Sequence, residues 1–242
     1  SSLLDGSVGD AAAANDQLLA EAAGDPNVLL GWFGQVCAIR AEQDRVAELV
    51  PLAEQTVADH GDLPAVRAVT GWLLAAAGDT AGAWDLIEPL AAVGFRTVPN
   101  GWLLPGTLAA LAPVVAERGS VDHCRYLLDR LGRYGGQFLV MGSGTTVAGA
   151  ADRFAGLLLA RVGSTAEAAD RLDRAADLEQ HLRAPLLRAH TLVDRSGLLS
   201  TSAEAGDRDV AHSLLDEAAA AGGAHPEWAW LRRRVAELRR RT

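Results

Sequence analysis

The side chains best suited to catalysis or metal binding in this 242-residue chain are six histidines, two cysteines and a run of spaced aspartates. A helical zinc site needs two histidines four residues apart, as in His-Glu-x-x-His, and no pair here has that spacing. His60 and His181 fall at the ends of predicted helices, where a partly positive imidazole complements the helix dipole. The histidines therefore indicate helix capping, and no metal ligand is predicted. They are His60, His123, His181, His190, His212 and His225.

Three aspartates, Asp170, Asp173 and Asp177, follow one another along a predicted helix, as carboxylates do in some metal clusters. Arg171 and Arg174 are interleaved with them, which favours a solvent-facing row of ion pairs. The chain contains no Gly-x-Ser-x-Gly motif, and no local Cys-His pair is present. No catalytic residue is predicted, so we expect a protein that is not an enzyme.

The cysteines and the basic residues argue against two further kinds of chemistry. Cys37 and Cys124 lie far apart in no Cys-x-x-Cys cluster, so we expect buried thiols in a cytoplasmic protein. A nucleotide-binding P-loop requires a lysine, and all 22 basic residues are arginines. The nearest look-alike, Gly142–Thr146, is interpreted as a flexible loop. No cofactor is predicted.

Amino-acid composition and net charge limit the fold classes and the kinds of partner that are expected. The chain is 49% hydrophobic and rich in alanine and leucine, with only 5% aromatic residues, which favours packed helices. A formal net charge of -9 gives no general attraction for nucleic acid or for anionic membranes. The uncharged runs 97–116 and 134–151 contain several prolines and glycines, so no membrane-spanning helix is predicted.

A recurring helix corner organises the sequence. A glycine suited to end one helix is followed at once by a residue suited to cap the next, and apolar or small residues return at +5, +8, +9 and +12 on one helical face. The corner at Gly163 has Arg171 at +8 and adds a predicted capping box between Ser164 and Glu167. A weaker copy begins at Ala41. The full corners are Gly78-Asp79, Gly119-Ser120, Gly163-Ser164 and Gly206-Asp207.

Spacings of 37 to 44 residues between corners fit two helices and a loop. The predicted fold is an all-α solenoid, an α-α superhelix of about six antiparallel helix pairs, forming a single domain over 1–242. The segment 135–148 is the longest break in the pattern, and 137–147 has room for a short hairpin. The predicted helices are 10–23, 26–40, 43–59, 64–77, 80–92, 102–118, 121–133, 149–162, 165–181, 184–199, 207–221 and 226–240.

Four segments between Gly61 and Leu199 carry a family resemblance. They are LLAAAGDTAGAWDLIEPLA at 73–91, YGG at 134–136, GAADRFAGLLLARVGSTAEAADRLDRA at 149–175 and RAPLLRAHTLVDRSGLL at 183–199. This region resembles the tetratricopeptide-like (TPR-like) helical region of large actinobacterial ATP-binding regulators, both LuxR-type transcriptional activators and ATPase-linked nucleotide cyclases. The resemblance implies a sensor or interaction module with an attached ATPase module outside this chain. Because the only methionine is Met141, we also interpret the chain as part of a longer protein.

The segment 225–242 is predicted to form a basic C-terminal capping helix. Trp228, Leu231, Val235 and Leu238 have helical spacing and would bury one side on the last repeat. Its arginines could lie against an acidic neighbour, lead into a further domain, or contact phosphate or an acidic protein. We favour the cap and expect no direct nucleic-acid binding. The arginines are Arg232, Arg233, Arg234, Arg239, Arg240 and Arg241.

Aromatic and arginine residues near the long loops are the predicted contacts for a partner, since such side chains often anchor ligands on concave helical surfaces. They are Trp102, Arg133, Tyr134, Phe138 and Arg153.

The expected function is a non-catalytic module of a cytoplasmic signalling or transcriptional regulator. It would bind a protein or a small-molecule effector and relay that binding to the attached ATPase module. The alternative is an interaction scaffold that recruits a partner or self-associates. A third reading, an all-α enzyme with a site assembled from remote residues, would require a large pocket with convergent carboxylates or histidines.

Overall fold

The computed structural model describes residues 4–21, 26–141, 146–201 and 206–241, and within them it contains twelve α-helices, two short 3-10 helices and one β-hairpin. The all-α class is therefore confirmed, with a small hairpin added in the region where one was allowed. The helices are α1 (Val8–Glu21), α2 (Pro26–Glu42), α3 (Val50–His60), α4 (Pro64–Ala76), α5 (Thr80–Ala92), α6 (Leu104–Arg118), α7 (Val121–Leu131), α8 (Ala151–Val162), α9 (Thr165–His181), α10 (Pro185–Leu199), α11 (Asp207–Gly223) and α12 (Ala229–Arg239). The 3-10 helices are η1 (Val46–Leu49) and η2 (Gly132–Tyr134), and the strands are β1 (Phe138–Met141) and β2 (Thr146–Ala150).

Proline positions explain the largest differences from the predicted helix boundaries. The predicted helix 43–59 is divided into η1 and α3, because Pro51 has no amide hydrogen and fits only the first turn of α3. Pro105 likewise lies in the first turn of α6, which begins at Leu104 instead of residue 102. The predicted helix 226–240 begins at Ala229, because Pro226 lies in a turn.

Two of the helix corners have the predicted backbone geometry. Gly78 and Gly163 have φ of +97° and +89°, the left-handed conformation that glycine adopts without strain. Asp79 caps α5 by accepting a hydrogen bond from the amide of Gly82 at 2.9 Å. Ser120 caps α7 in the same way and forms a capping box with His123. Here the sequence signals are confirmed.

The other details of the corner prediction are wrong. Gly119 has φ -74° and ψ 164°, so it is extended and not left-handed. Gly206 is itself the residue before the first turn of α11, with φ -81°. Ser164 makes no side-chain capping bond, so the predicted capping box with Glu167 does not form. A glycine followed by a polar residue thus marks a corner without fixing its geometry.

Most of the repeated apolar face is buried, and glycines bring the paired helices together. In α4, a Cβ at Gly71 would lie 2.8 Å from the side chain of Ile87 in α5. In α8, a Cβ at Gly156 would lie 2.7 Å from Leu172 in α9. Both partners are at the +9 position of their repeats. Small residues therefore set the close approach of these two helix pairs.

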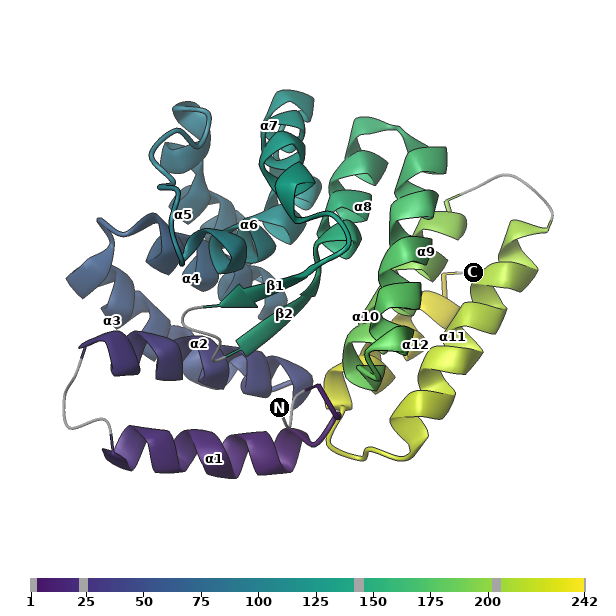
Figure 1. Ribbon diagram of the computed structural model, residues 1–242, viewed down its shortest axis with the longest axis horizontal. Coiled ribbons are helices and arrows are strands. Elements are labelled where there is room, and N and C mark those ends of the chain that lie inside the picture. The colour runs from purple at the N-terminus through teal and green to yellow at the C-terminus, as the bar shows by residue number, and fades with distance from the viewer. Residues whose placement is uncertain (1–3, 22–25, 142–145, 202–205, 242) are drawn as a thin grey trace.

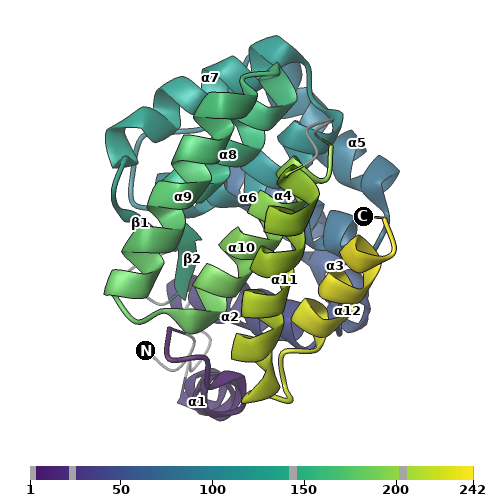
Figure 2. The same ribbon diagram turned by 90° about the vertical axis from the view of Figure 1, so that its right-hand side faces the viewer.

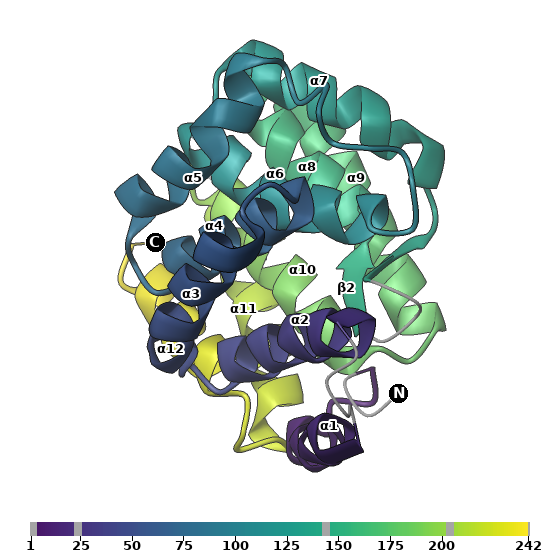
Figure 3. The ribbon, with the colours of Figure 1, turned by 90° about the vertical axis from the view of Figure 1, so that its left-hand side faces the viewer.

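The even-numbered helices form a ring inside the odd-numbered ones (Figures 1 and 3). Contacts run from α2 to α4, α6, α8, α10 and α12, and α12 contacts α2 again. Most of the outer helices pack between the two inner helices that flank them in the chain, as α9 does between α8 and α10 and α11 does between α10 and α12 (Figure 2). The helix array thus returns to its own beginning.

Two polar contacts join the C-terminal segment to the N-terminal part of the chain, and we call them the clasp. The indole Nε1 of Trp228, which is fully buried, donates a hydrogen bond to the carbonyl oxygen of Gly6 at 2.8 Å. The guanidinium of Arg233 donates from Nε to both carboxylate oxygens of Asp44, at 2.8 and 2.9 Å. Gly6 has φ +84°, and a Cβ there would collide with the Trp228 ring. The clasp joins α12 to the N-terminal helices.

The hairpin lies against the inner ring. β1 and β2 pair antiparallel with an irregularity between Leu139 and Val140, and β2 contacts α2, α6, α8 and α10. Leu139 is fully buried, so this segment is part of the packed interior. No helix in the described part of the chain is long and apolar enough to cross a membrane.

Candidate functional site: a central cavity

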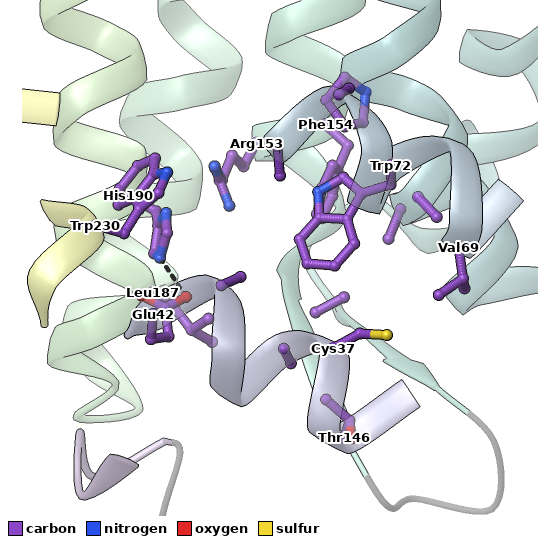
Figure 4. Close-up of a pocket in the computed structure, with 18 of the residues that line it drawn as sticks. Cys37, Glu42, Val69, Trp72, Thr146, Arg153, Phe154, Leu187, His190 and Trp230 are labelled. Atoms are coloured by element: carbon purple, nitrogen blue, oxygen red, sulfur yellow. Dashed lines mark hydrogen bonds and ion pairs between the residues drawn. The ribbon is translucent and has the colours of Figure 1, made fainter. Parts of the chain in front are cut away.

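A cavity of about 360 Å³ lies at the centre of the ring (Figure 4). Its walls come from all six even-numbered helices and from β2. The volume falls within the range of about 300–1,000 Å³ that is usual for small-molecule sites. Because every inner helix contributes to its wall, we take this cavity as the candidate functional site within the part of the chain that the structure describes.

Most of the cavity wall is apolar. The indole of Trp72 projects from α4 into the cavity, beside Val69 from the same helix (Figure 4). Ala109, Ala110 and Val114 of α6 add small aliphatic surface. This wall suits a flat apolar group, because the indole face offers stacking and the alanines leave room.

One end of the cavity is polar, and Arg153 is its principal group. This residue, in the first turn of α8, donates from Nε to Asp194 Oδ2 of α10 at 2.7 Å. Burial opposes its charge, but Asp194, Glu179 and Glu42 outweigh burial and raise the pKa of Arg153 above its ordinary value. The guanidinium therefore stays charged inside the ring.

A second polar pair lies beside Arg153. Glu42 Oε1, at the end of α2, is 2.8 Å from His190 Nε2 in α10. The His190 ring stacks on Trp230 of α12, with the ring centroids 4.1 Å apart. His190 Nδ1 and Glu42 Oε2 are buried and have no hydrogen-bond partner among the described residues. These contacts join α2, α10 and α12 around the cavity.

Burial shifts the pKa of two further groups near the site. Glu179 of α9 is fully buried and accepts a hydrogen bond from the amide of Ala150 at 3.3 Å. Burial raises the pKa of Glu179 above its ordinary value. Burial also raises the pKa of Cys37, whose side chain borders the cavity, so this thiol is not a nucleophile at neutral pH. Both cysteines are free and buried, as predicted.

Of the five predicted contact residues, the structure places Arg153 in the cavity wall. Trp102 lies in the turn before α6 with 53% of its surface exposed, and Arg133 is exposed in η2. Tyr134 packs against the main hydrophobic core, and Phe138 pairs with Ala150 in the hairpin. These four residues do not line the central cavity, and their contact with a partner stays a prediction.

Two predictions for the basic C-terminal segment are confirmed: its apolar face is buried, and some of its arginines lie against acidic residues. Trp228, Leu231, Val235 and Leu238 are all buried. Arg233 pairs with Asp44 and Glu237, Arg234 pairs with Glu237 and borders the cavity, and Arg239 pairs with Asp216. Arg232, Arg240 and Arg241 are exposed. The helix also contacts α2, so it closes the ring in addition to covering α11.

Five residues of the cavity wall were not predicted from the sequence: Glu42, Trp72, His190, Asp194 and Trp230. Glu42 and His190 are separated by 148 positions, so no local motif could connect them. One signal was present, because His190 stands in the apolar run LLRAHTLV, where a buried imidazole requires a polar partner. The identity of that partner depends on ring closure, which the sequence pattern does not encode.

Comparisons with protein-family models, with curated proteins and with solved structures gave no significant match to this chain. The fold and the site therefore define a class in structural terms only, a mainly α-helical protein with a ligand-sized cavity at the centre of its helix ring.

Proposed function

We propose that this chain is a non-catalytic module that binds a small-molecule effector in its central cavity. The observation that carries the proposal is a cavity of about 360 Å³ with an apolar wall at Trp72 and a charged group at Arg153. Apolar pockets with a few convergent polar groups are the usual form of small-molecule sites. The TPR-like superhelix, the cytoplasmic regulator and the attached ATPase module belong to the same proposal and rest on the family resemblance.

The contacts of the cavity also support a relay. Its walls include α2 and α12, the two helices whose contact closes the ring. A ligand that touches both helices binds the closed ring better than an opened one, and this difference in affinity shifts the population toward the closed form. An attached module that senses the position of either helix would register the effector.

An enzyme is the second candidate, because carboxylates and a histidine do converge in the cavity. Binding is the better reading of the geometry. Nε2 of His190 is occupied by Glu42, and Nδ1 is buried out of reach of a substrate. A general base must come within hydrogen-bond reach of the proton that it removes, and His190 offers no nitrogen for this. Cys37 stays a protonated thiol.

Native mass spectrometry of the freshly purified chain, compared with its denatured mass, tests the proposal directly. A small molecule that is released on denaturation would support the effector-binding reading and identify the ligand. A ligand-free symmetric oligomer would instead favour the scaffold alternative.

A cavity-filling substitution adds a structural control. Ala110→Leu places three more carbon atoms in the cavity, and we expect it to weaken effector binding by about tenfold or more, because the overlap displaces the ligand. The matched control is Ala58→Leu on the exposed side of α3, which should bind normally. Binding is measured by isothermal titration calorimetry with the molecule found by mass spectrometry. Equal affinity in the two variants would place the ligand elsewhere and contradict the proposal.

A further inference from the structure

The ligand class can be inferred from the groups that the cavity leaves without a partner, an inference that rests on the proposed function. Arg153 carries five N–H donors. Asp194 accepts from Nε, and no hydrogen bond between described residues uses the two terminal nitrogens of Arg153. The guanidinium lies between the His190–Trp230 pair and Trp72 and projects into the cavity (Figure 4). Neither nitrogen is among the buried groups that lack a partner, so both have accessible surface, which the acceptor of a ligand can reach.

The charges around Arg153 indicate what kind of acceptor this is. Asp194 already neutralises the guanidinium at 2.7 Å, and Glu42 is close enough to act on it electrostatically. A carboxylate or phosphate on the ligand would be placed near Asp194, Glu42 and Glu179, and Arg234, the other arginine that lines the cavity, is already paired with Glu237. Like charges held at short distance in a buried site repel strongly. An anion is therefore disfavoured at this end of the cavity.

A cationic ligand is disfavoured as well. It would meet the guanidinium of Arg153 at the polar end, and the unpartnered oxygen of Glu42, Oε2, is itself buried. The wall around Trp72 offers a cation at most a cation–π contact with the indole, which replaces only a small part of the hydration energy that the charge loses. An oxygen acceptor without net charge satisfies Arg153 and avoids both penalties.

We propose that the central cavity binds an uncharged, mainly apolar molecule whose carbonyl or hydroxyl oxygen accepts hydrogen bonds from the terminal nitrogens of Arg153. Its apolar body lies against Trp72 and the alanines of α6. Small aromatic or alicyclic ketones, amides, esters and alcohols belong to this class.

Three matched probes test the ligand class on the full chain. They share one naphthalene ring and differ in a single substituent, which is a carboxamide, a carboxylate or a methylammonium group. Affinities are measured by quenching of tryptophan fluorescence and by isothermal titration calorimetry. We expect the carboxamide to bind at least about tenfold more tightly than either charged probe.

Two variants examine the residues that set this preference. Arg153→Met removes the donors, and the carboxamide should lose about tenfold in affinity. Asp194→Asn keeps an oxygen that can accept from Arg153 Nε but removes the negative charge. The carboxylate probe should then gain about tenfold in affinity while the carboxamide changes little. The second variant keeps the test decisive if Arg153→Met does not fold.

The possible results distinguish the ligand class from the proposed function. Preference for the carboxamide, with the expected gain of the carboxylate in Asp194→Asn, supports the ligand class. If a charged probe binds wild-type protein as tightly as the carboxamide, and Ala110→Leu abolishes that binding, the ligand class is overturned and the proposed function survives. If none of the three probes binds and native mass spectrometry finds no ligand, both proposals are overturned.

Discussion

At the scale of single residues, the interior of this protein holds more charge than its composition suggests. Glu42, Arg153, Glu179, His190 and Asp194 come from four helices and gather around one end of the cavity. Arg153 is predictable from the sequence, because arginines near long loops often anchor ligands. The other four were not predicted, because their partners lie far away in the sequence, and only His190, in the apolar run LLRAHTLV, carried a local signal.

The buried carboxyl of Glu179 gives a pH dependence that can be measured. Its pKa is raised by burial, whereas in the unfolded chain it returns to its ordinary value of 4.5. As the pH rises from below 4.5 through the folded-state pKa, the folded state keeps a proton that the unfolded state has lost. This group therefore lowers the free energy of unfolding progressively across that interval.

Glu179→Gln is expected to remove this component. The amide oxygen can still accept from the amide of Ala150, but the side chain no longer titrates. The variant should gain stability relative to wild-type protein as the pH rises, and the difference should become constant well below pH 4.5. Urea unfolding at a series of pH values measures it. A difference that is constant with pH would show that Glu179 is not the group responsible.

At the scale of helices and turns, the sequence is a good guide wherever the signal is local. The predicted helices 80–92 and 165–181 have the observed boundaries, and the glycine corners mark real turns. Prediction from local signals fails where an apolar helical pattern contains a proline. Pro51 in the interior of a helix would have a high energetic cost. η1 therefore ends at Leu49, and Pro51 lies in the first turn of α3.

The close approach of paired helices provides a matched test at two glycines. Gly156→Ala is expected to lower the free energy of unfolding by about 1 kcal/mol, because overlap with Leu172 outweighs the better helix propensity of alanine. Gly197→Ala in α10 meets nothing within 4 Å and should raise it by about 0.5–1 kcal/mol. Chemical denaturation measures both. Equal stabilisation by the two substitutions would mean that α8 and α9 are not in close contact.

At the scale of the whole molecule, the closure of the ring is the feature that the sequence did not predict. A repeat pattern reports how each helix pairs with its neighbours, and it is the same for an open array and for a closed one. Closure depends on contacts such as Gly6 with Trp228 and Asp44 with Arg233, which no periodicity connects. The central cavity exists only because the ring closes, so it could not be predicted from the sequence either.

Trp228→Phe tests the contribution of the clasp to stability. It removes the hydrogen bond to Gly6 and leaves a small void, so we expect the free energy of unfolding to fall by about 1–3 kcal/mol. Trp102→Phe is the control, because Trp102 is 53% exposed, and it should change stability by less than about 0.5 kcal/mol. Guanidinium denaturation gives both values. Similar effects in the two variants would mean that the clasp contributes little.

The clasp also predicts an order of events during folding. Helix pairs such as α8 with α9 are joined by short loops, whereas Gly6 and Trp228 are separated by 222 positions. Contacts so distant in sequence form late, because the chain must first lose the entropy of a very large loop. In stopped-flow experiments Trp228→Phe should therefore accelerate unfolding and leave the refolding rate nearly unchanged. We therefore expect the chain to assemble pair by pair as an open arc, with the cavity formed only in the final step.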